Sequence, residues 1–150
     1  MTSRYTANPN CGDCGKKKGP KQVNSLRCYS CQRTANRKAK ETKHATHIKA
    51  TYGITPEAYK ALFSHQNGAC AICQRATGHT RRLAVDHNHG CSEGHPKNVG
   101  CPECVRGLLC GTCNTFIGRM HDDPEAGDRM AAYLRNPPFQ QLRKSFGEAT

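Results

Sequence analysis

Hydrophobic residues recur with helical spacing in one segment near the middle of the chain. Tyr59, Leu62 and Phe63 lie three and four positions apart, which places them on one face of an α-helix. Thr55-Pro56-Glu57 marks its start, because threonine is a favoured N-cap, proline is tolerated at the first helical position, and an acidic residue suits the first turn. Gly68 is a stop signal. The pattern predicts a short helix with a buried apolar stripe.

An alternating pattern further along the chain predicts a pair of strands. Leu83 and Val85 alternate with less apolar residues, which indicates a strand ending at His87. Residues 105–109 can return as its antiparallel partner. The polar segment 88–104 between them is long for a hairpin turn, so we expect an elaborated loop there.

Two more helices are predicted after the second strand. Cys110 opens a short helix that runs to about Met120. Asp123-Pro124-Glu125 then repeats the signal of cap, proline and acid, so we expect a last helix that ends near Leu134.

The two ends of the chain differ in character from its middle. Residues 32–52 are rich in Arg, Lys, Ala and Thr and contain no glycine or proline, which predicts a basic, solvent-facing helix. The segment 137–150 is polar, and we expect a mobile tail. These patterns predict a small α+β protein with a basic nucleic-acid-binding part at 1–50, a mixed part at 51–136, and the tail.

Composition changes this picture because the chain has little apolar material for a core. Only 35% of its residues are hydrophobic, 6% are aromatic and none is tryptophan, so apolar burial stabilises a domain of this length only weakly. The 11 cysteines offer another means of stabilisation. The first ten residues lack the apolar stretch of a signal peptide, so we expect a cytoplasmic, reducing environment that favours zinc over disulfides.

Ten of the 11 cysteines occur as five Cys-x-x-Cys pairs, a spacing that suits two sulfurs on one tetrahedral zinc ion. Two pairs flank the predicted strands, and we expect a zinc ion to join them. Two N-terminal pairs, separated by a hairpin-sized loop, predict a small zinc ribbon. The alternative for both sets is ordinary buried cysteines or redox pairs. The sets are Cys70, Cys73, Cys110 and Cys113, and Cys11, Cys14, Cys28 and Cys31.

A third group lies in the loop between the predicted strands. Cys91, His95, Cys101 and Cys104 have a spacing compatible with a Cys₃His zinc site that would order this loop. The alternatives are a different fourth ligand, such as His89, or free thiols. The chain is therefore expected to hold two structural zinc ions, or three if this group also binds one.

The charge distribution predicts a polyanionic partner. The formal net charge is +12, and residues 1–50 carry 12 Lys and Arg against 2 acidic residues, whereas residues 51–150 carry 11 against 9. DNA or RNA is the most common partner of such a field. No segment approaches the roughly 20 apolar residues of a membrane-spanning helix, so we expect no membrane role. The predicted phosphate contacts are Lys16, Lys17, Lys18, Lys21, Arg33, Arg37, Lys38, Lys40, Lys43 and Lys49.

A different kind of chemistry is indicated at the end of the first predicted strand. Asp86-His-Asn-His89 stands there, and Asn114 comes at the start of the helix after the second strand. Carboxylate and carboxamide oxygens are hard ligands that suit Mg²⁺ or Mn²⁺ rather than zinc. Asp86 and Asn114 are therefore candidates to share such an ion. In a regular strand His87 points away from Asp86, so a shared site needs a bulge or turn between them. The alternative is a solvated polar turn.

These motifs together strongly resemble the recombination endonuclease VII branch of the HNH, or His-Me finger, nucleases, which occur mainly in bacteriophages. The resemblance covers roughly residues 52–134. Its motifs here are Tyr52-Gly-Ile-Thr-Pro-Glu57, Cys70-x-x-Cys73, Leu83-Ala-Val-Asp-His-Asn-His89, Val105-Arg-Gly-Leu-Leu-Cys110, Cys113-Asn114 and Asp122-Asp-Pro-Glu125.

The resemblance implies a ββα-metal core with flanking helices and a metal-dependent DNA endonuclease. Asp86 and Asn114 would hold the catalytic Mg²⁺ or Mn²⁺, His87 would be the general base, and His89 would support the phosphate or the water on the metal. Three positions after Asn114, where the nuclease that names the branch has an acidic residue, this chain has Ile117.

The expected reaction is phosphodiester hydrolysis that nicks or cleaves duplex or branched DNA and leaves 5′-phosphate ends. The resemblance also implies a phage origin, with the host cytoplasm as the site of action. Besides DNA, a second copy of the chain and other phage DNA-processing proteins are candidate partners. The alternative function is a non-catalytic zinc-finger protein that binds DNA or acts as an adaptor.

Removal of residues 1–50 is expected to weaken DNA binding and to flatten its dependence on salt, because this part carries most of the positive charge. The chemistry of the remaining part should be spared. Binding titrations across a salt series check this, and an unchanged salt slope would contradict the predicted division of labour.

Overall fold

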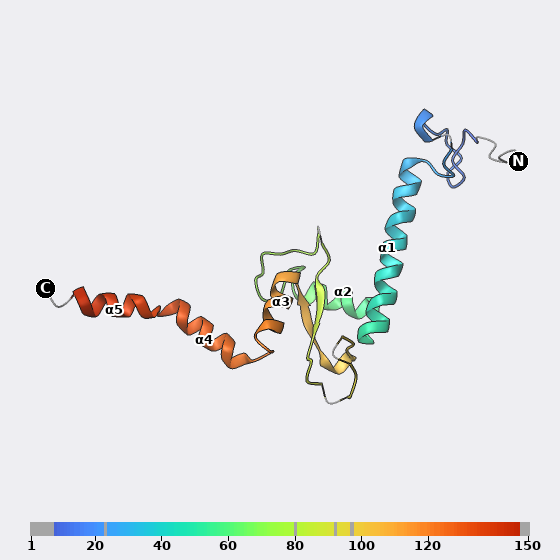
Figure 1. The fold of residues 1–150 in the computed structure, drawn as a ribbon. Helices are drawn as coiled ribbons and strands as arrows, with labels where there is room; N and C mark the ends of the chain where they lie inside the picture. The colour runs from blue at the N-terminus through green and yellow to red at the C-terminus, as the bar shows by residue number, and fades with distance from the viewer. Residues whose placement is uncertain (1–7, 23, 80, 92, 97, 148–150) are drawn as a thin grey trace, which may run out of the picture. The chain divides into compact units, whose positions relative to one another are not determined.

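The computed structural model describes residues 8–22, 24–79, 81–91, 93–96 and 98–147. The chain divides into two compact units, 1–50 and 51–150, which are described separately. The elements drawn in Figure 1 are η1 (Pro20–Gln22), α1 (Tyr29–Tyr52), α2 (Pro56–His65), β1 (Ala84–His87), η2 (Pro102–Cys104), β2 (Val105–Leu109), α3 (Gly111–Arg119), α4 (Pro124–Arg135) and α5 (Pro138–Gly147).

The N-terminal unit is a cysteine turn followed by a long helix. A short antiparallel bridge joins Asn10 to Lys17 around the first cysteine pair. The predicted zinc ribbon is wrong in its second half, because Cys28 directly precedes α1 and Cys31 lies in its first turn. No glycine or proline interrupts residues 29–52, so the chain continues as a helix where a ribbon needs a second hairpin.

The three helices predicted in the C-terminal unit are confirmed, and their caps act as the sequence indicates. Thr55 Oγ1 accepts a hydrogen bond from the N–H of Ala58, the third residue of α2, at 3.1 Å. Cys110 caps α3, its sulfur accepting from a first-turn N–H at 3.5 Å. Asp123 accepts from the N–H of Glu125, the second residue of α4, at 2.9 Å. Each cap satisfies an N–H that the helix itself leaves unbonded.

The predicted strands form a two-stranded antiparallel hairpin, with α2 beside β2 and α3 against both strands (Figure 1). Pairing is regular as far as Asp86 opposite Gly107, and it then shifts so that His87 faces Val105. Arg106 is therefore the extra residue on β2. The shift falls between Asp86 and His87, at the position where the sequence predicts a bulge or turn for a shared site.

One side chain binds the outer edge of β2 at Leu108. Gln66, at the end of α2, donates to the Leu108 carbonyl at 2.8 Å and accepts from the Leu108 N–H at 2.8 Å. The same amide donates to the Ala69 carbonyl at 3.0 Å. An exposed strand edge invites pairing with other chains, so Gln66 both seals the hairpin and ties it to α2.

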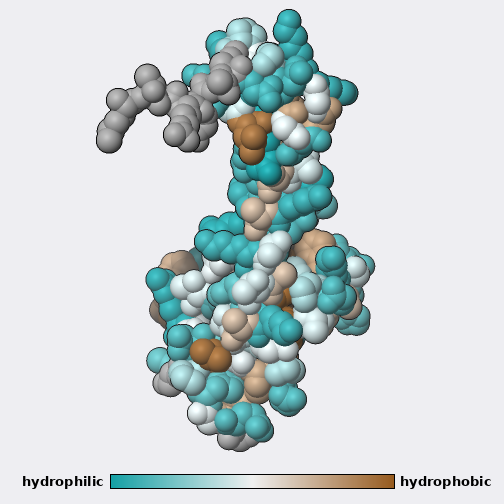
Figure 2. Space-filling model, turned by 90° about the vertical axis from the view of Figure 1, so that its right-hand side faces the viewer, coloured by the Kyte–Doolittle hydropathy of each residue, from teal (hydrophilic) through white to brown (hydrophobic). Residues whose placement is uncertain are grey.

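The core is small, as composition predicts. Hydrophobic side chains appear as separate spots on the largely hydrophilic face shown in Figure 2. No helix among the described residues is both long enough and apolar enough to cross a membrane. The buried hydrophobic residues are Cys11, Ile48, Ile54, Tyr59, Cys70, Leu83, Val85, Cys104, Leu108 and Leu109, of which three are cysteines.

The C-terminal segment departs from the mobile tail that we expect from its polarity. Residues Pro138–Gly147 form α5, while 148–150 lie outside the described part of the chain. Proline at the first helical position starts a helix rather than ending one. Phe139, Leu142 and Phe146 follow at helical spacing and are all exposed, so this segment carries an apolar stripe that its overall polarity conceals.

Gln66→Ala is expected to lower the free energy of unfolding by about 2 kcal/mol, because it leaves the fully buried Leu108 without the partner of its N–H. Urea unfolding with bound zinc held constant measures this. The matched control is Gln32→Ala, which removes an exposed side-chain bond to Asn36 on α1 and should change stability by less than about 0.5 kcal/mol. Equal losses in both variants would contradict the role given to Gln66.

Candidate metal centres and a histidine–carboxylate site

The four cysteines that flank the hairpin come together as one candidate zinc site. One ligand atom from each of Cys70, Cys73, Cys110 and Cys113 lies within 4.8 Å of all the others. The N–H of Ala76 lowers the pKa of Cys73 to about 6, whereas burial and the Cys110 sulfur raise that of Cys113 to about 12. Thiolates this close oppose one another's ionisation, and a bound Zn²⁺ would stabilise all four. The donor set therefore fits zinc.

The N-terminal cysteines form a second cluster of the same kind. The sulfurs of Cys11, Cys14, Cys28 and Cys31 also lie within 4.8 Å of one another. Hydrogen bonds from the backbone N–H groups of Cys28 and Cys14 lower the pKa of Cys11 to about 6. The neighbouring sulfurs of Cys28 and Cys14 raise the pKa of Cys31 to about 12. This set can also hold a zinc ion.

The two clusters share a local fold that the cysteine spacing does not reveal. In each, the carbonyl of the first cysteine, Cys11 or Cys70, accepts a hydrogen bond from the residue four positions later, at 2.9 and 3.0 Å. That later residue has a positive φ, 69° at Gly15 and 54° at Gln74. In each, the second cysteine pair stands at the start of a helix, α1 or α3. Both units thus use a tight cysteine turn joined to a helix N-terminus.

The third predicted group is also assembled. Cys91, His95, Cys101 and Cys104 place one ligand atom each within 4.8 Å of all the others, and His95 Nε2 lies 3.5 Å from the Cys104 sulfur. The alternative ligand His89 instead contacts a carboxylate elsewhere. The loop between the strands can therefore hold a third zinc ion, with His95 as its fourth ligand.

A separate site without sulfur ligands stands at the end of β1. The side chains of Asp86 and His87 are both buried, with 6% and 8% of their residue surface exposed. The His87 ring packs against two others, with ring centroids 5.4 Å from Tyr52 and 4.8 Å from His89. Gly100 closes the site, because a Cβ there would stand 3.3 Å from His87 and 3.1 Å from Tyr52. Packing therefore holds the imidazole of His87 in place.

Sequence reasoning does not identify the network that links these residues. Arg106 binds the Asp86 carboxylate through two hydrogen bonds of 2.7 and 2.9 Å and reaches Asp122 at 3.0 Å. His89 Nδ1 lies 2.9 Å from the other oxygen of Asp122. Burial raises the pKa of Asp122, but the hydrogen bonds from His89 and Arg106 outweigh it and lower that pKa overall. A charged residue within the apolar run Val105–Leu109 is the sequence signal that could have pointed to Arg106.

Asn114 lies in the first two turns of α3, the helix that contacts both strands. Further along the chain, Ile117 of α3 and Met120, directly after α3, border a hollow of about 370 Å³ that Asp86 and Arg106 also border. The structure thus places Asp86, His87 and His89 together at the end of β1. It places Asn114 on the adjoining helix α3, three residues before Ile117, which borders the same hollow.

The predicted phosphate contacts in the N-terminal unit are exposed with one exception. Lys18 is buried, with 7% of its surface exposed, and its ammonium donates to the Ser25 carbonyl, so it is not available to DNA. On α1, Arg33, Arg37 and Lys40 border one hollow of about 590 Å³. The exposed members of the predicted set are Lys16, Lys17, Lys21, Arg33, Arg37, Lys38, Lys40, Lys43 and Lys49.

Comparison with known proteins gives one family and two phage relatives. The recombination endonuclease VII family model matches residues 45–136. The Gene 59 protein of Mycobacterium phage D29 is 43% identical over 117 residues, which are 77% of this chain and 64% of the relative. The Gene 59 protein of Mycobacterium phage L5 is 40% identical over 117 residues, or 77% and 65%. The chain spans just under two-thirds of the length of these relatives.

Metal analysis of the purified protein is expected to find three zinc ions per chain, one for each cluster. His95→Ala should lower the count to two after dialysis against a competing chelator, because three sulfurs then hold the third ion without their fourth protein ligand. His79→Ala removes an exposed histidine of another loop and should leave the count at three. A wild-type count of two, unchanged by His95→Ala, would reject the third site.

Proposed function

This chain belongs to the recombination endonuclease VII family, and from that membership we propose that it is an HNH-type endonuclease that hydrolyses DNA phosphodiesters with Mg²⁺ or Mn²⁺. The observation that carries the proposal is the buried pair Asp86 and His87 at an irregular strand end, beside the helix that bears Asn114. A purely structural zinc module has no need of such a group beside its sulfur clusters.

Asp86 and Asn114 are the residues that would hold the catalytic ion. An ionised carboxylate offers about four lone-pair positions, and Arg106 uses one on each oxygen of Asp86. Acceptor positions thus remain for a cation, and their hard oxygens suit Mg²⁺ or Mn²⁺. When bound, that ion would offset negative charge that develops on the phosphate and on the departing oxygen.

His87 is the proposed general base. A neutral imidazole takes a proton from the attacking water, and histidine suits this step because its ordinary pKa is near neutrality. The rings of Tyr52 and His89 pack against His87 and limit its rotation. A base held in one orientation loses less freedom on reaching the transition state. The expected products carry 5′-phosphate and 3′-hydroxyl ends.

Arg106, Asp122 and His89 are proposed to position this site. Arg106 orients Asp86 and Asp122 together, and Asp122 in turn orients His89. Orientation through a second layer of hydrogen bonds is how proteins fix ligand and base geometry. His89, which is exposed, would then present its other ring nitrogen toward the phosphate.

A second candidate function rests on the same ion pair. Both oxygens of Asp86 already bind Arg106, as they would in a structural role. The protein would then be a non-catalytic zinc-containing DNA-binding module or adaptor. In either case we propose DNA as the partner, a phage-infected host cytoplasm as the place of action, and homodimers or other phage DNA-processing proteins as further candidate partners.

His87→Ala is expected to reduce the Mg²⁺-dependent nicking of supercoiled plasmid by about 100-fold or more, the effect of removing a general base. Zinc content and circular dichroism should be unchanged. His65→Ala, an exposed histidine at the end of α2, is the matched control and should cleave like the wild type. A His87→Ala protein as active as its parent would remove His87 from the mechanism, and a wild type inactive with both Mg²⁺ and Mn²⁺ would favour the adaptor.

A further inference from the structure

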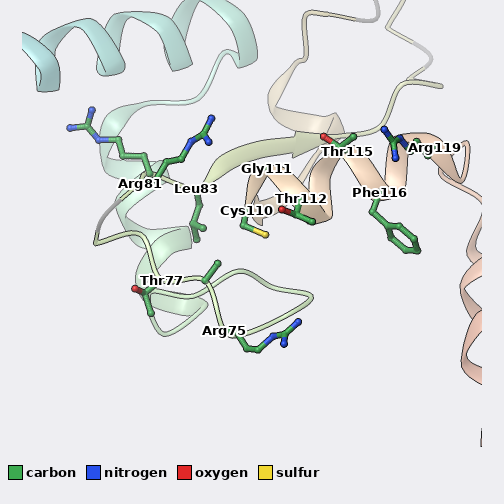
Figure 3. A pocket seen from close by; sticks show the side chains of 12 residues that line it. Arg75, Thr77, Arg81, Leu83, Cys110, Gly111, Thr112, Thr115, Phe116 and Arg119 are labelled. Atoms are coloured by element: carbon green, nitrogen blue, oxygen red, sulfur yellow. The ribbon is translucent and has the colours of Figure 1, made fainter. Parts of the chain in front are cut away.

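Four arginines are among the residues that line a hollow of about 780 Å³ on the C-terminal unit (Figure 3). Arg75 comes from the cysteine turn, Arg81 and Arg82 from the segment before β1, and Arg119 from the last turn of α3. They come from three separate segments, and no acidic side chain stands among the described residues that line the space.

The rest of the lining also suits an anion. Thr112 and Thr115 place two hydroxyl groups on the face of α3 that borders the hollow. Gly111 begins α3 there, and a Cβ at Gly111 would meet no atom within 4 Å, so the helix start is open to a ligand. The N-terminal end of a helix carries a partial positive charge. It adds to the arginines here rather than defining the site alone.

The hollow keeps a net positive charge even beside the negatively charged zinc cluster. Cys110 belongs both to the lining and to that cluster, and four thiolates around one Zn²⁺ carry a net charge of −2. The positive charge of the four guanidinium groups outweighs this negative charge. Arginine also binds phosphate oxygens through two parallel hydrogen bonds, which a point charge does not.

The hollow is distinct from the proposed catalytic site but close to it. Its lining uses Thr112, Thr115 and Arg119 of α3, whereas Ile117 and Met120 border the Asp86 hollow on another face of the same helix. It also includes Leu83, at the opposite end of the strand segment from His87. Four residues of extended chain span about 13 Å, which is the rise of about four base pairs along the axis of a DNA duplex.

We propose that this arginine hollow, defined by Arg75, Arg81, Arg82 and Arg119, binds the phosphate backbone of DNA a few nucleotides from the cleaved bond. The inference rests on the proposed endonuclease function for the identity of its ligand. Contacts to phosphates position a duplex without reading its bases. The site would therefore set how DNA lies across β1 and α3.

The test compares two double variants that each remove two exposed arginines. The variant Arg81→Gln with Arg119→Gln removes two positive charges from the lining of the hollow. The variant Arg135→Gln with Arg143→Gln removes the same charge from α4 and α5. Arg82 is kept because it acts electrostatically on the buried Tyr59. Affinity for a fluorescent DNA duplex is measured by anisotropy over a salt series, without added Mg²⁺ or Mn²⁺, after zinc content and circular dichroism confirm that both variants are folded.

The hollow variant is expected to bind DNA roughly tenfold more weakly at 0.1 M salt, with a salt slope smaller by about 1 to 2, because each lost phosphate contact removes about 0.9. In the control variant, the affinity and the salt slope should each change by less than half as much as in the hollow variant. Equal effects in the two variants, or none in the hollow variant, would overturn the inference. Preferential loss of RNA binding, with DNA binding kept, would also overturn it.

Failure of the endonuclease proposal gives a different result. If the wild type cleaves no DNA with either metal, yet only the hollow variant loses affinity and salt dependence, the phosphate site stands and the nuclease does not. If the wild type cleaves DNA while both variants bind it as tightly as their parent, the nuclease stands and the hollow is not its DNA contact.

Discussion

The convergence of Cys70, Cys73, Cys110 and Cys113 is the constraint on which the C-terminal unit depends. This unit has few buried apolar side chains, and one of them is the fully buried Cys70 itself. The Cys73 and Cys110 sulfurs, 37 positions apart in sequence, lie 3.9 Å from each other. Joining such distant segments through one metal ion removes much of the freedom of the intervening chain in the unfolded state. A zinc ion here would thus provide stability that a larger hydrophobic core provides in other proteins.

The proposed catalytic site inherits its geometry from this constraint. The cluster holds the start of α3, and α3 lies against both strands of the hairpin that the cluster encloses. Within the hairpin, the extra residue Arg106 shifts the pairing of β2 with β1, and it reaches Asp86 and Asp122 with one guanidinium group. One inserted residue therefore accounts for both the bulge and the ion pair. Arg106 shifts the pairing at the strand end, and its guanidinium orients the neighbouring carboxylate of Asp86.

The two units of this protein differ in net charge, and within the C-terminal unit charges of opposite sign lie in different places. The N-terminal unit carries an evident positive excess, and most of its predicted contacts are exposed. The C-terminal unit has nearly balanced charge, but its acidic residues Asp86 and Asp122 are tied to Arg106 while four other arginines gather around a separate hollow on α3. A nearly neutral total thus conceals a strongly basic surface, since a nucleic acid responds to local potential rather than to net charge.

Local signals in the sequence were enough to predict α2, the two strands, α3 and α4, because caps, prolines and apolar spacing act over a few residues. Cysteine spacing likewise predicted the three metal clusters. The mistaken ribbon and tail show the limit of such signals, since neither pair spacing nor overall polarity reveals where a helix begins. The network of Arg106, Asp122 and His89 and the arginine hollow join residues from separate segments, from β2 to the turn before α4 and from the cysteine turn to the end of α3. Only the tertiary structure decides such contacts, because they depend on how distant segments pack, and no short-range pattern in the chain records that.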